Sequence, residues 1–277
     1  MTITAGLFLL GTVYIGVCLG YWSLHRFFAF FPSRRIKKLP SDYNMSYDEV
    51  FFQAADRTRL QGWVLYSKKS PVLINNKQAM IVFFSGWAGT MSKFLPGLNT
   101  LLEKGFNVFT FGYRGFGQSD FRWPTEKGVF KDAEGAVTFL VREKGLDPQQ
   151  LILYGQSLGC ALASRAAVRV QPRALILEGG FLSLADEVRR FITWLPVRLL
   201  TTSRFSLREY LPRLRCRVLV AHSAEDRAVG MENAEKIFHA AHEPKDKIVI
   251  HGPHAQGLRV QSEPYVAAII EFITKEP

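Results

Sequence analysis

Short apolar runs alternate with longer segments of helical periodicity, and no other feature of the chain limits its possible folds as strongly. The apolar runs are Met80 to Phe84, Asn107 to Phe111, Leu151 to Tyr154, Ala174 to Glu178, Arg217 to His222 and Lys247 to His251. The helical segments are Lys127 to Glu143, Leu158 to Val170, Met231 to Ala241 and Gln261 to Thr274. Because the strands are apolar throughout and separated by helices, the sequence predicts an α/β fold with a mostly parallel sheet and helices on both faces. An antiparallel hairpin of Glu49 to Ala55 and Leu60 to Tyr66 is predicted before it.

The composition is that of a packed body rather than of a disordered or repetitive chain. Of the 277 residues, 48% are hydrophobic and 21% are charged, which excludes intrinsic disorder and collagen-like repeats. Residues 47–277 suffice for one large α/β domain. Cys18, Cys160 and Cys216 form no CxxC pair and have no histidine cluster at zinc spacing. We therefore expect no disulfide framework, no metal and no cofactor.

Residues 1–25 form a candidate membrane anchor. Thr2 to Leu24 carry no charged side chain, and about 20 apolar residues suffice to span a bilayer. An aromatic run that resembles an interfacial belt lies between Arg26 and Pro32. A cleavable signal peptide is the alternative, but the segment lacks a basic start and a small-residue cleavage site. We predict an uncleaved, single-pass N-terminal transmembrane helix whose partner is the lipid bilayer.

Basic side chains cluster in the linker that follows the anchor, residues 26–46. Five of them precede the first acidic residue, Asp42: Arg26, Arg34, Arg35, Lys37 and Lys38. Cytoplasmic flanks of transmembrane segments carry the excess of Lys and Arg, so the domain that follows is predicted to face the cytoplasm. A large C-terminal domain can also be exported behind an uncleaved anchor, which leaves the outward orientation open.

A second basic stretch runs from Arg189 to Arg217, where eight arginines accompany a single acid, Glu209. The arginines alternate with apolar side chains such as Phe191 and Trp194. This pattern suits an anionic lipid surface better than a nucleic-acid groove, and we expect no nucleic-acid partner. A solvated basic face is the alternative.

The sequence Gly155-Gln156-Ser157-Leu158-Gly159 directly follows a predicted strand and opens a predicted helix. A GxSxG motif between a strand and a helix is typical of a nucleophile elbow. The turn is too tight for side chains at the glycine positions, and it projects the serine hydroxyl over the sheet edge. Ser157 is therefore the candidate nucleophile, with a helix-capping serine as the alternative.

A serine nucleophile requires a base and a carboxylate that orients it, in the chain order serine, acid, histidine. His254, in the loop after the last strand, is the candidate base, and His251 at the strand end is the alternative. The acid is expected after the preceding strand, where Asp226 is the candidate and Glu225 the alternative. His222 is expected to brace this loop.

Two backbone N–H groups are predicted to bind the oxyanion of the transition state. One belongs to Leu158, directly after the candidate nucleophile. The other belongs to the loop Ser85-Gly86-Trp87-Ala88-Gly89-Thr90, in which Trp87 is the candidate donor.

Together these motifs resemble the α/β-hydrolase fold, and in particular its membrane-anchored branch of lysophospholipases, monoacylglycerol lipases and protein depalmitoylases. The resemblance is carried by Phe30 to Ser33, Phe111 to Ser119, Gly155 to Gly159, His222 to Asp226 and the His254 loop. It implies Ser157, Asp226 and His254 as nucleophile, acid and base, with Trp87 and Leu158 as oxyanion donors. It also implies a lid-like insertion of about residues 181–214 above Ser157.

Two loops depart from the pattern of this branch. Its oxyanion loop usually resembles His-Gly-Asn-x-Gly-Asn, whereas Ser85, Trp87 and Thr90 stand here in place of the histidine and both asparagines. Its last loop usually carries Gly-x-Gly-His, which is shortened here to Gly252-Pro253-His254. These departures affect the region around the acyl group.

The sequence predicts a membrane-anchored serine hydrolase that cleaves carboxylic esters or thioesters of lipid or lipidated substrates through an acyl-enzyme on Ser157. A peptidase or soluble-ester hydrolase on the same three residues is one alternative. A catalytically silent hydrolase-like scaffold that binds lipid or protein is another.

Overall fold

The computed structural model describes residues 3–28, 30–86 and 89–275. Its body is built on a sheet with the strand order β1-β2-β6-β5-β7-β8-β9-β10. The strands are β1 (Ser46–Gln53), β2 (Arg59–Tyr66), β5 (Met80–Phe84), β6 (Asn107–Phe111), β7 (Leu151–Gln156), β8 (Ala174–Glu178), β9 (Arg217–Ser223) and β10 (Lys245–Ile250). The pairs β1/β2 and β2/β6 are antiparallel, and the pairs from β6 across to β10 are parallel. The predicted α/β fold with its opening hairpin is confirmed, and a small β3 (Leu73–Ile74)/β4 (Lys77–Gln78) ribbon is added.

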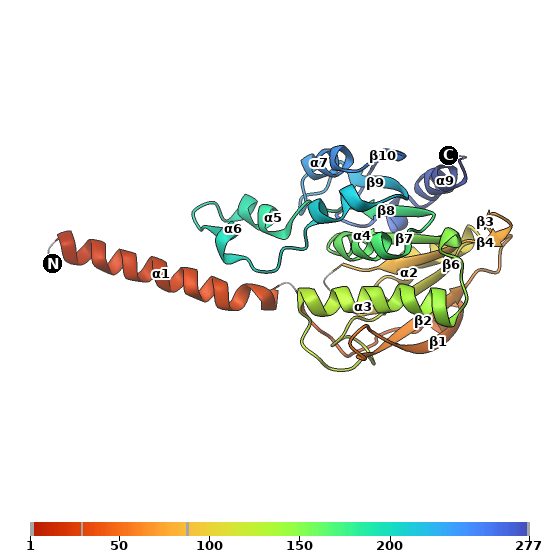
Figure 1. Ribbon diagram of the computed structural model, residues 1–277, viewed down its shortest axis with the longest axis horizontal. Helices are drawn as coiled ribbons and strands as arrows, with labels where there is room; N and C mark the ends of the chain where they lie inside the picture. Colours follow the sequence, from red (N-terminus) through yellow and green to blue (C-terminus); the bar gives the residue numbers. More distant parts are fainter. Residues whose placement is uncertain (1–2, 29, 87–88, 276–277) are drawn as a thin grey trace.

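Helices cover both faces of the sheet (Figure 1). One face carries α3 (Glu126–Thr138), α4 (Gly159–Val170) and α7 (Glu232–Ala240), and a π-helical turn over Phe139–Glu143 extends α3. The other face carries α2 (Leu95–Glu103), α8 (Gly257–Val260) and α9 (Ser262–Thr274). The sequence did not predict α2, because Pro96 and Gly97 disfavour a helix interior. Pro96 lies in the first turn, where proline is tolerated.

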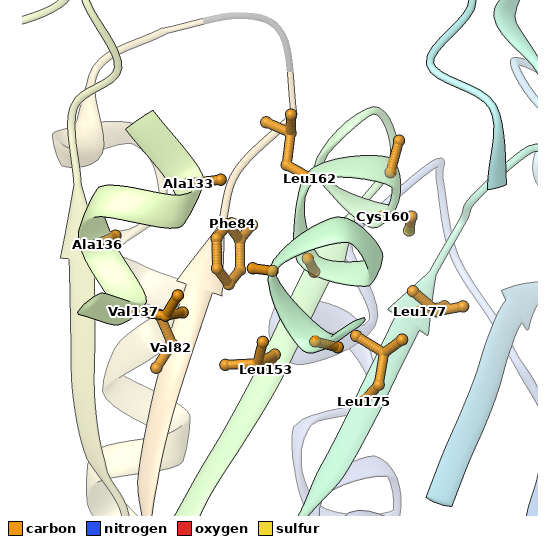
Figure 2. Packing of buried hydrophobic residues seen from close by; sticks show 14 of the residues in the cluster. Val82, Phe84, Ala133, Ala136, Val137, Leu153, Cys160, Leu162, Leu175 and Leu177 are labelled. Carbon is orange, nitrogen blue, oxygen red and sulfur yellow. The ribbon is translucent and has the colours of Figure 1, made fainter. Parts of the chain in front are cut away.

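Strand β5 explains why the central strands are apolar throughout. Val82 and Phe84 pack with α3 and α4, whereas Ile81 and Phe83 pack in the core on the opposite face. All four side chains are buried because both faces of a parallel sheet are covered. Figure 2 shows Val82 and Phe84 beneath Leu162 of α4, next to neighbouring strand residues such as Leu153.

Helix α1 (Ile3–Phe28) extends away from the body (Figure 1). Among the described residues, its segment Ile3–His25 is the one helix long and apolar enough to cross a membrane by length and composition. At a rise of 1.5 Å per residue the 26-residue helix is about 39 Å long. Its apolar side chains are exposed rather than packed on the body, with Phe8 78% accessible.

The segment between β8 and β9 contains α5 (Leu184–Phe191) and α6 (Val197–Leu200), which lie on the side of the body from which α1 projects (Figure 1). This segment contacts α1 at three positions between Tyr14 and His25. The Tyr21 and Thr201 hydroxyls are hydrogen-bonded at 2.8 Å, and His25 Nε2 lies 3.0 Å from Thr202 Oγ1. Tyr14 donates to the Trp194 carbonyl at 3.2 Å. The predicted insertion therefore packs against the candidate anchor.

Candidate active site

Three loops at the carboxyl ends of parallel strands carry the candidate site. Ser157 follows β7, Asp226 follows β9 and His254 follows β10. Carboxyl ends of parallel strands meet at one edge of the sheet, which is where α/β folds place reactive groups. The three side chains predicted from separate parts of the sequence are brought together there.

The turn at Ser157 has the backbone strain of a nucleophile elbow. Ser157 has φ +56°, a left-handed backbone conformation that residues other than glycine rarely adopt. A Cβ placed on Gly159 would lie 2.1 Å from the carbonyl oxygen of Phe84 on β5. Only a glycine at position 159 therefore lets the start of α4 lie this close to β5. The resulting tight turn places the Ser157 hydroxyl at the sheet edge.

A continuous hydrogen-bond chain joins the three side chains. Ser157 Oγ lies 2.8 Å from His254 Nε2, and His254 Nδ1 lies 2.6 Å from Asp226 Oδ2. An imidazole that donates from Nδ1 to the carboxylate accepts at Nε2, so it can take the proton of the serine hydroxyl. This is the geometry that nucleophile activation requires.

The Asp226 carboxylate is buried, and both of its oxygens have hydrogen-bond partners. Its side chain is 1% exposed, and Oδ1 accepts hydrogen bonds at 2.9 Å from the backbone N–H groups of Ala228 and Val229. Burial alone would raise the pKa of Asp226. The hydrogen bonds from His254, Val229 and Ala228 outweigh burial and lower the pKa, so the carboxyl stays ionised beside the imidazole.

The alternative pair lies on the surface. His251 Nδ1 is 3.1 Å from Glu225 Oε1, and the two side chains are 59% and 60% exposed. The neighbouring His222 is fully buried at the end of β9, where its Nε2 lies 2.9 Å from the Val229 carbonyl oxygen. His222 thus has the bracing position expected of it, since Val229 also donates to Asp226.

The predicted oxyanion donors are only partly described. Leu158 directly follows Ser157 and precedes α4, whereas Trp87 lies outside the described residues. Gly86 borders the site, because a Cβ placed there would lie 3.5 Å from Ser157 Cβ. Gly86, just after β5, therefore lies beside the candidate nucleophile.

A pocket of about 150 Å³ opens beside Ser157 and His254. Its apolar walls include Phe83, Phe94, Leu98 and Leu258, and its basic residues are Lys93 and Arg259. Sequence reasoning missed this pocket. Phe83 comes from β5, whereas the other wall residues come from α2, α8 and their flanking turns, which lie far apart in the chain.

A buried carboxyl that sequence reasoning also missed lies beneath the site. Glu178, at the end of β8, accepts a hydrogen bond at 2.8 Å from the N–H of Gly257, and its own carbonyl accepts the N–H of Ser157 at 2.8 Å. The Tyr154 hydroxyl donates to its carboxyl. Burial raises the pKa of Glu178 despite these hydrogen bonds. Glu178 links the serine turn to the start of α8, just after the histidine loop.

The described residues contain no group of three or more His, Cys, Asp or Glu side chains that could hold a metal ion. The absence of a metal and of a cofactor from the working protein stays a prediction. Cys160 and Cys216 are buried thiols, and burial raises the pKa of both.

This sheet, with a serine, a histidine and an aspartate at the carboxyl ends of its strands, defines an α/β hydrolase. Known proteins agree. The family described as serine aminopeptidase, S33, matches residues 75–209. The uncharacterized protein YfhR of Escherichia coli (strain K12) is 32% identical over 234 residues, 82% of this chain and 81% of that protein. The chain belongs to the α/β-hydrolase family.

Two further comparisons cover most of the chain. An uncharacterized protein of Mycobacterium tuberculosis (strain ATCC 25618 / H37Rv) is 30% identical over 261 residues, 94% of this chain and 91% of that protein. The esterase Pf2001 of Pyrococcus furiosus superposes with a TM-score of 0.69 at 18% identity, over 87% of this chain and 97% of the esterase. The similarity to the esterase is one of fold. These comparisons support the α/β-hydrolase fold and family.

Proposed function

We propose that this hydrolase is a membrane-anchored serine hydrolase that cleaves carboxylic esters or thioesters of lipid or lipidated substrates. The observation that carries the proposal is the hydrogen-bond chain from Ser157 through His254 to the buried Asp226, beside an open pocket. A solvated or merely structural serine would not need a strained backbone and an oriented imidazole together.

In the proposed reaction His254 Nε2 takes the proton of Ser157 Oγ as the oxygen attacks the acyl carbon. The imidazolium that forms is stabilised by Asp226. The backbone N–H groups of Leu158 and Trp87 donate hydrogen bonds to the acyl oxygen and stabilise its negative charge. The bond from the acyl carbon to the leaving alcohol or thiol then breaks, and the leaving group takes the proton from His254.

Water completes the cycle. His254 removes a proton from a water molecule, whose oxygen attacks the acyl-enzyme, and the bond to Ser157 Oγ breaks with return of a proton to the serine. The carboxylic acid is released. All steps use side-chain and backbone groups of this chain, as in other serine hydrolases.

The lipid part of the proposal rests on α1 and on the segment it contacts. Phe191, Trp194 and Leu199 are 66%, 62% and 85% exposed beside the candidate anchor. Arg198 pairs with Asp186 at 2.7 Å, and Arg190 pairs with Glu187 at 2.9 Å. Since acids of α5 neutralise part of the basic stretch, its exposed apolar side chains are the stronger argument for a membrane surface. The lid role of residues 181–214 stays a prediction, and the described residues that line the pocket come from other segments.

Membrane association has a direct test. Replacement of Phe191, Trp194 and Leu199 together by serine should reduce activity on aggregated lipid more than activity on a soluble short ester. Charge reversal of Arg189, Arg190 and Arg198 should weaken binding to anionic vesicles. Equal losses on both substrates would mean that this face is only a solvated surface.

We also propose a chain organised as an anchor (1–25), a basic linker (26–46) and a hydrolase domain (47–277) that faces the cytoplasm. The orientation follows from the basic linker. Protease treatment of sealed right-side-out vesicles tests it. The hydrolase domain should stay intact until lysis, and its digestion before lysis would reverse the orientation.

The hydrolysis itself is tested with the full chain in detergent and a short, neutral phenyl ester. Wild-type protein should turn over the ester, and Ser157→Ala should not. The name of the matching family makes a peptidase the second candidate, and an aminoacyl anilide is the matched substrate for it. Turnover of the anilide alone would favour the peptidase, and turnover of neither substrate by folded protein would favour a silent scaffold.

A further inference from the structure

The pocket beside Ser157 is bordered by two cationic side chains, Lys93 and Arg259. No acidic residue is among the described residues that line it. We propose that this pocket binds an anionic group, a carboxylate or a phosphate, on the alcohol or thiol part of the substrate. The inference rests on the proposed hydrolase function and specifies its substrate class.

The two cationic side chains come from separate elements of the fold. Lys93 ends the turn Met91–Lys93 before α2, and Arg259 lies in α8, two residues after the Gly257 N–H that Glu178 holds. Glycines make room for both aliphatic stems. A Cβ on Gly89 would lie 2.9 Å from Lys93 Cδ, and a Cβ on Gly97 would lie 3.4 Å from Arg259 Cγ. The stems therefore pass close to these two glycines, and both residues, although exposed, border the same pocket.

The charge of Arg259 is available to a ligand. Within the part of the chain that the structure describes, no carboxylate lies within 4.0 Å of its guanidinium, and the nearby Glu263 pairs with Lys104 instead at 2.6 Å. Guanidinium groups bind carboxylates and phosphates through two parallel hydrogen bonds. Lys93 adds a second positive charge to the same pocket.

The size of the pocket indicates a small group rather than a fatty acyl chain. Its volume of about 150 Å³ is close to that of an apolar cavity that holds benzene, and it lies below the ~300 to 1,000 Å³ typical of sites for drug-sized ligands. Phe94, Leu98 and Leu258 can cover a few carbon atoms between the ester and the anionic group. A long acyl chain would have to lie outside this pocket.

The position of His254 assigns the pocket to the leaving group. In the proposed reaction His254 hands its proton to the departing alcohol or thiol. His254, Ala255 and Gln256 line the same pocket as Arg259. The leaving group therefore lies on the side of Lys93 and Arg259, where its anionic substituent meets both cations.

Matched phenyl esters test the inference with the full chain in detergent. Phenyl acetate is the neutral substrate, while 4-acetoxybenzoate and 4-acetoxyphenyl phosphate place a carboxylate or a phosphate on the leaving group. We expect kcat/KM to be at least about tenfold higher for one or both anionic esters, because hydrogen bonds between charged groups are stronger than those between neutral groups. The ester with the larger gain identifies the preferred anion. A gain that falls as salt is added is also expected.

Variants separate the two cations from general effects. Arg259→Gln should lower the ratio of anionic to neutral kcat/KM about tenfold, and Lys93→Gln should lower it several-fold. Arg142→Gln, which removes an exposed charge that does not line the pocket, should leave the ratio unchanged. Mono(4-nitrophenyl) succinate against 4-nitrophenyl butyrate places the anion on the acyl side, and a preference for this anion alone would overturn the assignment.

The two proposals can fail separately. Phenyl acetate turned over without a preference for the anionic esters, or with a ratio unaffected by Arg259→Gln, would overturn the anion pocket and leave the hydrolase. If folded wild-type protein cleaved none of the esters, the proposed hydrolase would fail and the pocket with it.

Discussion

Two clusters of side chains each pair a buried aspartate with a basic side chain. They differ in what else the basic side chain contacts. In the first, Arg114 binds Asp132 at 2.6 Å and Asp56 at 3.0 Å, and the Arg114 and Asp132 side chains are 6% and 0% exposed. In the second, Asp226 holds His254, which contacts the Ser157 hydroxyl beside a pocket. The first cluster pairs its charges among themselves. The second ends in the Ser157 hydroxyl, the proposed nucleophile, which borders a pocket.

This difference separates structural from chemical use of buried charge. Arg114 donates to two carboxylates and ties the turn after β6 to α3 and to the β1–β2 turn. All three of its guanidinium nitrogens donate to these carboxylates, so we expect Arg114 to act on stability alone. The imidazole of His254 is 24% exposed, and its hydrogen-bond partners among the described residues are Asp226 and Ser157. We therefore propose that a proton moves from Ser157 to His254 when a substrate arrives.

The largest expected effect is on turnover. Ser157→Ala, His254→Ala and Asp226→Asn should each lower kcat by about 10⁴-fold or more, with little change in the unfolding midpoint. Combined variants should lose no more than the single ones, because the three groups act as a unit. Steady-state hydrolysis of a short ester and circular dichroism measure both quantities. Retained activity in His254→Ala, with loss in His251→Ala, would move the base to His251.

The reverse pattern is expected in the structural cluster. Asp132→Asn leaves Arg114 buried with one carboxylate fewer, and breaking a buried pair costs about 3–5 kcal/mol. Chemical unfolding should show this loss, while kcat per folded molecule stays within about twofold of wild type. Glu134→Gln is the matched control, since its half-exposed partner Arg165 predicts a loss below about 1 kcal/mol. If Asp132→Asn abolished turnover in folded protein, the contrast between the clusters would not hold.

Glu178 is a buried carboxyl beside the candidate site, and its effect on stability should depend on pH. Its pKa is raised by burial, so the folded protein keeps this proton at pH values where the unfolded chain has lost it. Stability from this group is thus full below the ordinary carboxyl pKa of about 4.3 and declines as pH rises through the raised pKa. Glu178→Gln removes this titration. Its free energy of unfolding relative to wild type should improve as pH rises above about 4.3, and a difference constant with pH would contradict the raised pKa.

The smallest effect is expected at the exposed pair. His251→Ala and Glu225→Gln remove a histidine–carboxylate contact of 3.1 Å, against 2.6 Å at the site, and both side chains are more than half exposed. Exposed ion pairs contribute at most about 1 kcal/mol. The free energy of unfolding should therefore stay within about 1 kcal/mol of wild type, and kcat/KM within about twofold. A hundredfold loss of kcat/KM in either variant would show that the exposed pair takes part in catalysis.

Much of the fold and the candidate triad follows from local sequence. The strand before Ser157, the glycines at 155 and 159 and the helix after them are contiguous, so the elbow can be predicted without knowing the fold. Asp226 and His254 follow from chain order and from their places after strands. The roles of Lys93, Arg259 and Glu178 could not be predicted. Lys93 and Arg259 border one pocket, and Glu178 contacts the start of α8, only once distant parts of the chain have packed together. The acids that neutralise Arg190 and Arg198 were missed for a related reason. Asp186 and Glu187 precede the counted stretch, and Glu232 follows it.

The central claim is that His254, held by Asp226, activates Ser157, and labelling by a fluorophosphonate probe with mass spectrometry of the labelled peptide tests it most directly. We predict that the probe modifies Ser157 at the same rate in wild type and in His251→Ala. The label should be absent in Ser157→Ala, and labelling should be at least about 100-fold slower in His254→Ala. A label on another serine, or equal labelling rates in wild type and His254→Ala, would contradict the claim.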